Sequence, residues 1–116
     1  MPTMPLQTEE ELWLQEICHR FLPHFPNVVE PTVYIEDELP NAAEYAFRTN
    51  EILFRRAFFI DSSLADLDML MRHELIHAWT WQNQIDEEWH GSAFQAMAEH
   101  MKVWYDDSCK MPRRLA

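Results

Sequence analysis

The amino-acid sequence predicts an α+β fold that consists of one helix, three strands and two further helices. Two patterns support this prediction: apolar residues recur at every third or fourth position in the outer parts of the chain, and β-branched and aromatic runs lie between them. Hydrophobic residues make up 47% of the 116 residues, which is enough to build the core of one domain. We therefore expect a single domain over residues 1–116, with its core over about 8–105 and a tail over 106–116.

The first helix is predicted to begin at Thr8. Thr8 and Glu11 have the spacing of a capping box, in which each side chain satisfies a backbone N–H of the other residue. Apolar residues continue at near-helical spacing to Leu22, and Pro23 and Pro26 then end the pattern.

Three short runs, at residues 32–36, 44–48 and 51–60, are predicted to be β-strands. Each run is rich in β-branched, aromatic or other apolar residues, which favour extended structure. Thr49-Asn50 makes a compact turn between the second and third runs, and residues 37–43 make a looser link between the first and second.

Two helices are predicted to follow the strands. Apolar residues recur at helical spacing over residues 64–84, and the polar residues 61–63 supply candidates for the N-cap of this long helix. Ser92 and Gln95 form a second capping signature, which opens a last helix that extends to about Trp104.

The composition excludes several classes of function. Nine basic and twenty acidic residues give a formal net charge of −11, which repels a phosphate backbone, so we expect no direct nucleic-acid binding. We see no signal peptide and no apolar run long enough to span a membrane, so a cytoplasmic location without membrane contact is expected. Cys18 and Cys109 form no CxxC pair, and both are predicted to be free buried thiols.

The long predicted helix contains a candidate metal-binding segment, His73-Glu74-Leu75-Ile76-His77. Residues four apart lie on one helical face about one turn from each other, so both imidazoles can reach a single metal ion. Glu74 is offset around the helix, where it can reach a metal-bound water without being a ligand. A catalytic zinc site needs three protein ligands and an open position, so this pattern requires a third ligand from elsewhere.

His90 is the first candidate for that third ligand. Twelve residues separate it from His77, which allows the chain to leave the helix, turn back and present an imidazole from a second direction. The single glycine, Gly91, follows directly and would allow a close approach or an unusual backbone angle. A metzincin would carry a glycine and a histidine soon after His77, but the sequence there reads AWTWQN. Glu99 stays open as an acidic alternative, as in gluzincins.

In these segments the sequence resembles the SprT-like domain, the zincin-type metallopeptidase core also found in the Spartan proteases. The resemblance rests on the apolar strand that ends at Ile60, on the helix with HELIHAW and on the later His90-Gly91-x-x-Phe94. It extends over about residues 8–105. The resemblance implies a zincin-like α+β fold and a protein or peptide substrate.

The same resemblance implies that His73, His77 and His90 bind Zn²⁺ and that Glu74 is the general base. Zinc would polarise the substrate carbonyl and lower the pKa of its bound water, while Glu74 would pass a proton from that water to the leaving amine. An exposed strand edge beside the site could hold an extended peptide by main-chain pairing. Many SprT-like proteins carry a cysteine zinc ribbon or DNA-binding segments after this core, and this chain has neither, so a role at DNA would need a recruiting protein partner.

Two other functions fit the same motif. One is an ImmA/IrrE-like regulatory metalloprotease with an acidic third ligand, and the other is a non-catalytic interaction module stabilised by zinc, which would have no need of a base at Glu74. The residue that stabilises the oxyanion is left open among Tyr45, Tyr105 and His100. Four tryptophans surround the motif, and most of them are expected in the core between the last two helices: Trp79, Trp81, Trp89 and Trp104.

Overall fold

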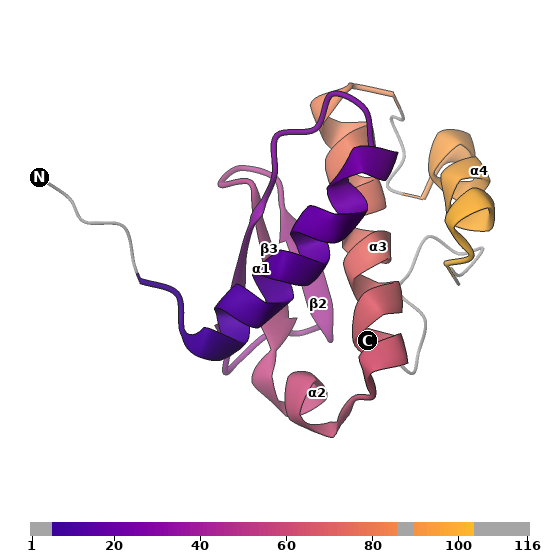
Figure 1. The fold of residues 1–116 in the computed structure, drawn as a ribbon. Helices are drawn as coiled ribbons and strands as arrows, with labels where there is room; N and C mark the ends of the chain where they lie inside the picture. The colour runs from indigo at the N-terminus through magenta and orange to yellow at the C-terminus, as the bar shows by residue number, and fades with distance from the viewer. Residues whose placement is uncertain (1–5, 86–89, 104–116) are drawn as a thin grey trace, which may run out of the picture.

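A computed structural model of the protein describes residues 6–85 and 90–103 (Figure 1). In chain order the elements are α1 (Glu9–Phe21), the 3-10 helix η1 (Leu22–His24), β1 (Thr32–Glu36), β2 (Ala43–Ala46), β3 (Glu51–Arg55), α2 (Arg56–Asp61), α3 (Leu64–Gln82) and α4 (Ser92–Met101). This order confirms the predicted α+β class, with the additional short helix α2 between the sheet and the long helix. No helix in the described ranges is long and apolar enough to cross a membrane.

The three strands form one mixed sheet in the order β1-β3-β2. β1 runs parallel to β3, whereas β2 runs antiparallel to β3 and forms one edge of the sheet. Side chains alternate between a buried face and a half-exposed face along every strand, as in β2, where Ala43 and Tyr45 are buried and Glu44 is not. The sheet therefore needs a covering layer on one face only.

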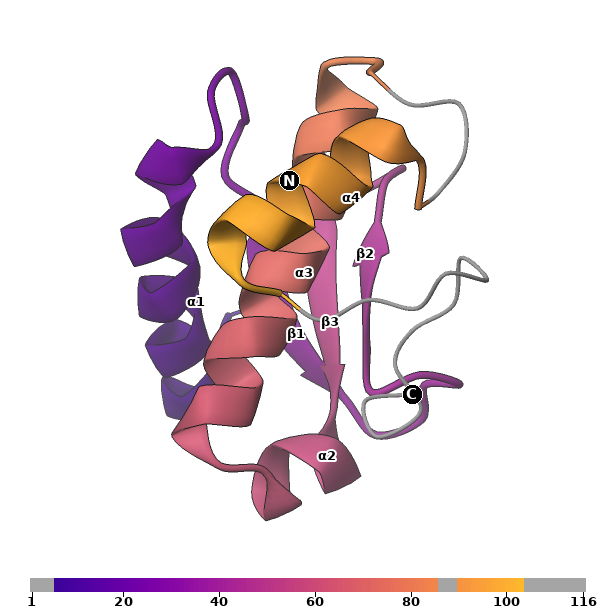
Figure 2. The same ribbon diagram turned by 90° about the vertical axis from the view of Figure 1, so that its right-hand side faces the viewer.

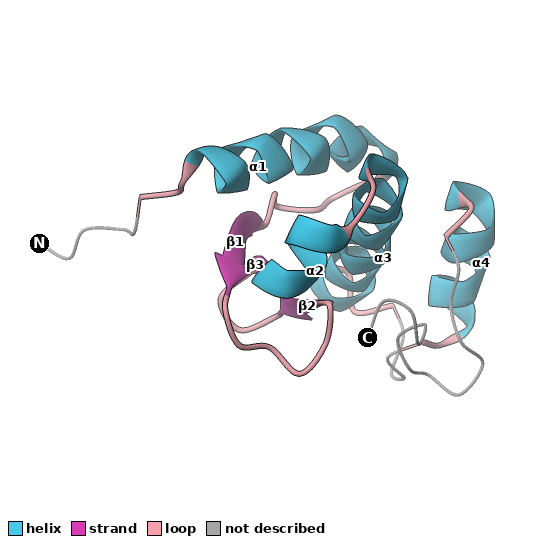
Figure 3. Ribbon diagram, turned by 90° about the horizontal axis from the view of Figure 1, so that it is seen from below, coloured by secondary structure: helices cyan, strands magenta, loops and turns pink. Residues whose placement is uncertain are grey.

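Helices α1 and α3 provide that layer, lying beside each other on the buried face of the sheet (Figure 2). Helix α4 lies against α3 on the side away from the sheet, as the view from below shows (Figure 3). Helix α3 is thus enclosed between the sheet, α1 and α4. Its residues from His73 to Ala78 are all buried for this reason.

The third strand is shorter than predicted, because residues 56–60 form helix α2 instead of continuing the strand. The last residue pair between β1 and β3 joins Glu36 to Arg55, so beyond Arg55 the chain has no neighbouring strand to pair with. The aromatic side chains of Phe58 and Phe59 still pack on the core, but from a helix. The apolar character of this run was predicted correctly and its strand conformation was wrong.

The second strand also differs at its ends from the predicted range 44–48. It begins at Ala43 and ends at Ala46, and residues 47–50 form a turn. Asn50 has a φ of 54°, which is the left-handed conformation that asparagine tolerates better than most residues. The compact turn at Thr49-Asn50 is therefore confirmed, although it takes two residues from the predicted strand.

The capping predictions hold for α1 and α3 but not for α4. Thr8 and Glu11 form the predicted capping box, and the Ser63 hydroxyl accepts a hydrogen bond from the backbone N–H of Asp66 at 3.2 Å. At α4 the N-cap is Gly91, and Ser92 is already the first helical residue. Helix α4 ends at Met101, and the predicted end at Trp104 lies outside the described residues.

Candidate metal centre

The buried part of α3 presents three polar side chains in succession. His73, Glu74 and His77 are each no more than 1% exposed, although polar groups of this kind are usually found at the surface. They are buried because this stretch of α3 runs between the sheet and α4, and the apolar residues Leu75 and Ile76 occupy the remaining positions. A buried polar cluster costs free energy unless its members bind one another or a ligand, so it indicates a site.

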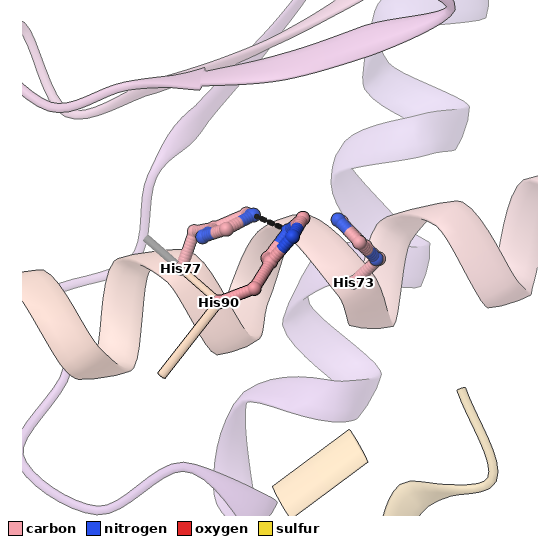
Figure 4. A group of neighbouring side chains, drawn as sticks. All are labelled: His73, His77 and His90. Atoms are coloured by element: carbon pink, nitrogen blue, oxygen red, sulfur yellow. Dashed lines mark hydrogen bonds between the residues drawn. The ribbon is translucent and has the colours of Figure 1, made fainter. Parts of the chain in front are cut away.

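His90 joins the two histidines of α3 from a separate segment, directly before α4 (Figure 4). His90 is 1% exposed, and its Nε2 atom lies 3.1 Å from Nε2 of His77. One nitrogen from each of His73, His77 and His90 lies within 4.8 Å of the others, and this group could hold a metal ion. The structure thus brings together the three histidines that the sequence had singled out.

Phe94 on α4 packs against all three imidazole rings. Its ring centroid lies 5.1 Å from that of His73, 4.6 Å from that of His77 and 4.6 Å from that of His90. The Phe94 side chain is fully buried. Because rotation of an imidazole would displace this ring from a close-packed position, Phe94 restricts the orientations of the three histidines.

Gln95 fixes the backbone at His90 from the next position of α4. Its side-chain amide donates a hydrogen bond to the carbonyl of His90 at 2.9 Å. The sequence pattern suggested a capping box with Ser92, but the amide acts here on the residue before the N-cap. Gly91 has a φ of −74° and a ψ of −173°, which other residues also adopt, so the prediction of an unusual backbone angle is wrong. Gly91 is buried, and a close approach of the chain at this position stays a prediction.

Burial and neighbouring charge both act on His77. The pKa of His77 is lowered well below its usual value of 6.5, first because burial disfavours the charged form and then because His73 and His90 would repel a proton. Its imidazole is therefore neutral near pH 7. The neutral imidazole is the form that binds metal ions.

Glu74 connects this part of α3 to the edge strand β2. The pKa of Glu74 is raised to about 8, mainly by burial and also by the negative charge of Glu44, while a hydrogen bond from the backbone N–H of Tyr45 lowers it. Glu74 Oε2 has no hydrogen-bond partner among the described residues. Glu74 and His77 both line a cavity of about 220 Å³ whose other wall includes Glu44 and Tyr45 of β2.

The free edge of β2 faces this cavity. The backbone N–H of Arg55 donates to the carbonyl of Ala42. In the antiparallel register of β2 and β3, Ala42, Glu44 and Ala46 therefore direct their main-chain groups toward β3. Ala43 and Tyr45 then direct theirs away from β3, which agrees with the bond from the Tyr45 N–H to Glu74. The edge strand therefore carries outward main-chain groups next to the carboxyl.

The other sequence candidates lie outside the histidine group or outside the described residues. Glu99 and His100 are exposed on α4, and Glu99 does not belong to the group that could hold a metal ion. The hydroxyl of Tyr45 donates to Asn50 Oδ1 at 2.8 Å, so its proton is already used there. Tyr105 falls beyond the described part of the chain. These observations favour His90 over Glu99 as the third member of the site.

The predictions for the tryptophans and cysteines are partly confirmed, and some of these residues lie outside the described part of the chain. Trp79 packs against the core as expected, whereas Trp81 is 47% exposed and is not a core residue. Cys18 is a buried free thiol, as predicted. Trp89, Trp104 and Cys109 lie outside the described residues.

Several residues of the site were missed from the sequence. The contact of Glu74 with the Tyr45 backbone and the charge of Glu44 depend on how β2 lies over α3, and no spacing in the sequence encodes that placement. Phe94 was noted only as part of the segment after His90, without a contact to the imidazoles. The separation of four residues between His90 and Phe94, at the start of a predicted helix, was the sequence signal that could have indicated their contact.

Comparisons with known proteins show the family and the fold of the chain. The sequence matches the SprT-like family over residues 14–114. No curated protein matches the chain in sequence. Among solved structures, the metallopeptidase zymogen jannalysin of Methanocaldococcus jannaschii is similar with a TM-score of 0.60 and 17% identity, covering 82% of this chain and 84% of that one. At this identity the likeness shows a shared fold, and the family match covers most of the sequence. The chain therefore belongs to the SprT-like family.

Proposed function

We propose that this protein is a zinc-dependent metallopeptidase in which His73, His77 and His90 hold the metal ion and Glu74 is the general base. The observation that carries the proposal is the convergence of three buried imidazoles, with ligand atoms within 4.8 Å of one another, beside a buried carboxyl. The SprT-like family match and the fold shared with a metallopeptidase support it.

The donor set fits zinc. Three neutral imidazoles with one position left open are a common ligand set of catalytic zinc. Two nitrogens bound to one tetrahedral ion, with Zn–N bonds of about 2.0–2.1 Å, lie about 3.3 Å apart. The 3.1 Å between the Nε2 atoms of His77 and His90 is close to that separation. When bound, zinc would polarise a substrate carbonyl and make water a stronger nucleophile near neutral pH.

Glu74 is suited to move the proton. One oxygen of its carboxyl has no hydrogen-bond partner among the described residues and is available to accept a proton from the attacking water. The hydrogen bond from the Tyr45 N–H holds the carboxyl at the wall of the cavity. A nearby cation would favour the charged carboxylate and so oppose the effect of burial on its pKa. Glu74 then transfers the proton to the leaving amine.

The substrate that fits this site is an extended segment of a protein or peptide. The outward N–H and carbonyl of Ala43 and the carbonyl of Tyr45 can pair with such a segment, as an added strand does at a sheet edge, whereas the Tyr45 N–H is bonded to Glu74. Pairing through the backbone places the carbonyl of the substrate beside the cavity that Glu74 and His77 line. Main-chain pairing recognises an extended backbone and gives little selectivity for the substrate side chains at this edge.

The test compares the native chain with Glu74→Gln and with Glu99→Gln as a matched control on an exposed acid. Zinc content by mass spectrometry should be one ion per chain in all three proteins. Cleavage of a denatured protein such as casein should fall about a thousandfold in Glu74→Gln and stay unchanged in Glu99→Gln. Full activity of Glu74→Gln, or a native chain that binds zinc and cleaves nothing, would refute the proposal.

A further inference from the structure

A second, larger hollow lies beside the cavity of Glu74, at the end of α3. It has a volume of about 960 Å³, and we call it the aromatic hollow, defined by Val29, Tyr45, Phe47, Asn50, Trp81 and Gln82. Tyr45 and Phe47 line both the aromatic hollow and the cavity that contains Glu74 and His77. The two hollows are therefore neighbours that share a wall at the edge strand and the turn that follows it.

Exposed apolar side chains are concentrated at this hollow. Three of the nine large hydrophobic side chains that are exposed in the described part of the chain line it: Val29 at 71%, Phe47 at 38% and Trp81 at 47%. The rings of Phe47 and Trp81 lie against each other with centroids 4.2 Å apart and planes tilted by 39°. Such a group of apolar side chains at a concave surface is typical of a binding site.

Three polar side chains of the hollow, those of Tyr45, Asn50 and Gln82, already bond one another. Asn50 Oδ1 accepts from the Tyr45 hydroxyl at 2.8 Å and from the Gln82 amide at 3.0 Å. The Gln82 carbonyl oxygen accepts from the backbone N–H of Val29 at 2.7 Å. This network joins α3 to the turn after β2 and to the segment before β1, so the wall is held in place without a ligand. The surface that remains for a ligand is mainly the apolar rings.

Charge further restricts what the hollow can accept. None of the described residues that line the hollow is charged, so a buried lysine of a ligand would find no opposite charge among them. The nearby charge is that of Arg48, whose guanidinium carbon lies 5.7 Å from the centroid of the Phe47 ring. An aromatic or large aliphatic side chain would bury apolar area against Phe47 and Trp81 without that cost.

The position of the hollow relates it to the site of cleavage. Trp81 follows His77 by four residues on α3, which is an advance of about 6 Å along the helix axis. An extended peptide advances about 3.3 Å per residue, so a segment at the edge strand would reach the hollow within about two residues of the scissile bond.

We propose that the aromatic hollow is a specificity site that binds an aromatic or large aliphatic side chain of the substrate, within two residues of the bond that is cleaved. This inference rests on the proposed peptidase function. The occupant of the aromatic hollow is a side chain of the same extended peptide that pairs with β2. The hollow shares Tyr45 and Phe47 with the Glu74 cavity, and this adjacency argues for a substrate side chain over an unrelated ligand.

The first experiment maps cleavage sites in denatured casein by mass spectrometry and measures kcat/KM for matched peptides that differ by Phe or Ala at the enriched position. The native protein should enrich Phe, Tyr, Trp and Leu at one position and prefer the Phe peptide about tenfold. Trp81→Ala and Phe47→Ala should reduce this ratio to near one. Trp13→Ala, which alters an exposed tryptophan on α1, should leave it unchanged. Circular dichroism checks that each variant is folded.

The second experiment measures binding of the same peptides, with a fluorescent label, to the zinc-loaded Glu74→Gln protein. Cleavage without a preference for Phe would refute the specificity site and leave the peptidase intact. Preferential binding of the Phe peptide without any cleavage by the native protein would refute the peptidase and leave the hollow as a peptide-binding site.

If Trp104→Ala or Tyr105→Ala in the full chain tightens binding of every peptide equally, the hollow holds the chain's own C-terminal segment and the proposal is wrong. If Trp81→Ala instead changes the mass of the particle in solution, the hollow binds a second copy, which also overturns it.

Discussion

His90 is the residue on which the metal centre depends most, because it comes from outside α3. His73 and His77 are held by one helix, whereas His90 is held by the hydrogen bond from Gln95 and by packing against Phe94. Its Nε2 atom nevertheless reaches to 3.1 Å from Nε2 of His77. The geometry of the centre is thus set as much by α4 as by the histidine pair.

We expect His90→Ala to weaken zinc binding by more than about a hundredfold, since losing even an outer-shell partner of a metal ligand costs about 10- to 100-fold. Glu99→Ala should bind zinc as the native chain does, because Glu99 is exposed and lies outside the histidine group. Competition with a zinc-binding dye measures both affinities. The opposite ranking of the two variants would assign the third ligand to Glu99.

Cys18 offers a residue-scale prediction away from the site. Burial, with a smaller contribution from the charge of Glu30, raises the pKa of the Cys18 thiol from 9.0 to about 12. In a Cys109→Ser background, iodoacetamide at pH 8 should modify the folded chain at least about tenfold more slowly than the urea-unfolded chain, because the thiolate is the reactive form.

The same shift makes the stability of the protein depend on pH. Above pH 9 the unfolded chain releases a thiol proton that the folded chain keeps, so the free energy of unfolding should fall as the pH rises from about 9 toward 12. Cys18→Ala should remove this part of the pH dependence in urea titrations. An unchanged slope in Cys18→Ala would show that Cys18 is not its source.

At the residue scale, the sequence pointed to the histidine pair and Glu74 because fixed spacing on a helix determines which side chains share a face. His90 lies outside that helix and was predicted instead from its separation from His77, from Gly91 and from the family resemblance. The sequence could not identify Glu44 or the Tyr45 N–H as partners of Glu74. Their contact depends on the packing of β2 over α3, which joins residues about 30 positions apart without any local pattern.

At the scale of elements, a buried carboxylate links α1 to the sheet, in addition to the hydrogen bond that Gln15 of α1 accepts from the N–H of Val33 on β1. Glu11 accepts from the backbone N–H of Thr8 at 2.8 Å, which closes the capping box, and from the N–H of Ile35 on β1 at 2.7 Å. The sequence predicted the first of these bonds from spacing. The second required knowledge of where β1 lies.

Glu11→Ala should therefore destabilise the protein by about 2–3 kcal/mol, because it removes the cap and leaves the buried N–H of Ile35 without an acceptor. Glu10→Ala, at an exposed neighbouring position, should change stability by less than about 0.5 kcal/mol. Urea unfolding followed by circular dichroism measures both. A small effect of Glu11→Ala would mean that water replaces the carboxylate at Ile35.

The boundary between β3 and α2 shows why some elements were mispredicted. Seven of the ten residues at positions 51–60 are apolar, and a run of this kind is compatible with a strand or with a helix. The strand ends at Arg55 because its parallel neighbour β1 pairs no further than this residue. The end of β3 is therefore set by strand pairing and not by the sequence of residues 51–60. Helix periodicity, in contrast, was sufficient to place α3 within two residues of its end.

For the whole molecule, the metal centre should contribute to stability as well as to activity. The three histidines come from two segments that pack on each other, so an ion that binds only the folded chain stabilises it by mass action. At a free zinc concentration one hundredfold above Kd this contribution is about 2.7 kcal/mol.

Chelation with EDTA should accordingly lower the melting temperature by about 10 °C and abolish cleavage, and added zinc should restore both. Glu74→Gln should show the same thermal shift, because it keeps all three ligands, and His90→Ala should show almost none. Differential scanning calorimetry with and without EDTA measures the shift. Equal melting temperatures of the native chain in both conditions would contradict a zinc site that depends on the fold.

The shortness of the edge strand has a consequence for the kind of protein that can be cleaved. β2 has four residues, and only Ala43 and Tyr45 turn their main-chain groups outward, with one N–H already bonded to Glu74. A substrate gains a few hydrogen bonds there, each worth about 0.5–1.5 kcal/mol net, which is less than the about 5–15 kcal/mol that holds a folded domain together. A peptidase with this edge cannot pull a strand from an intact target. It would instead act on segments of the target that are already unfolded. The rate at which a target protein is degraded would therefore follow the fraction of that protein in which such a segment is unfolded.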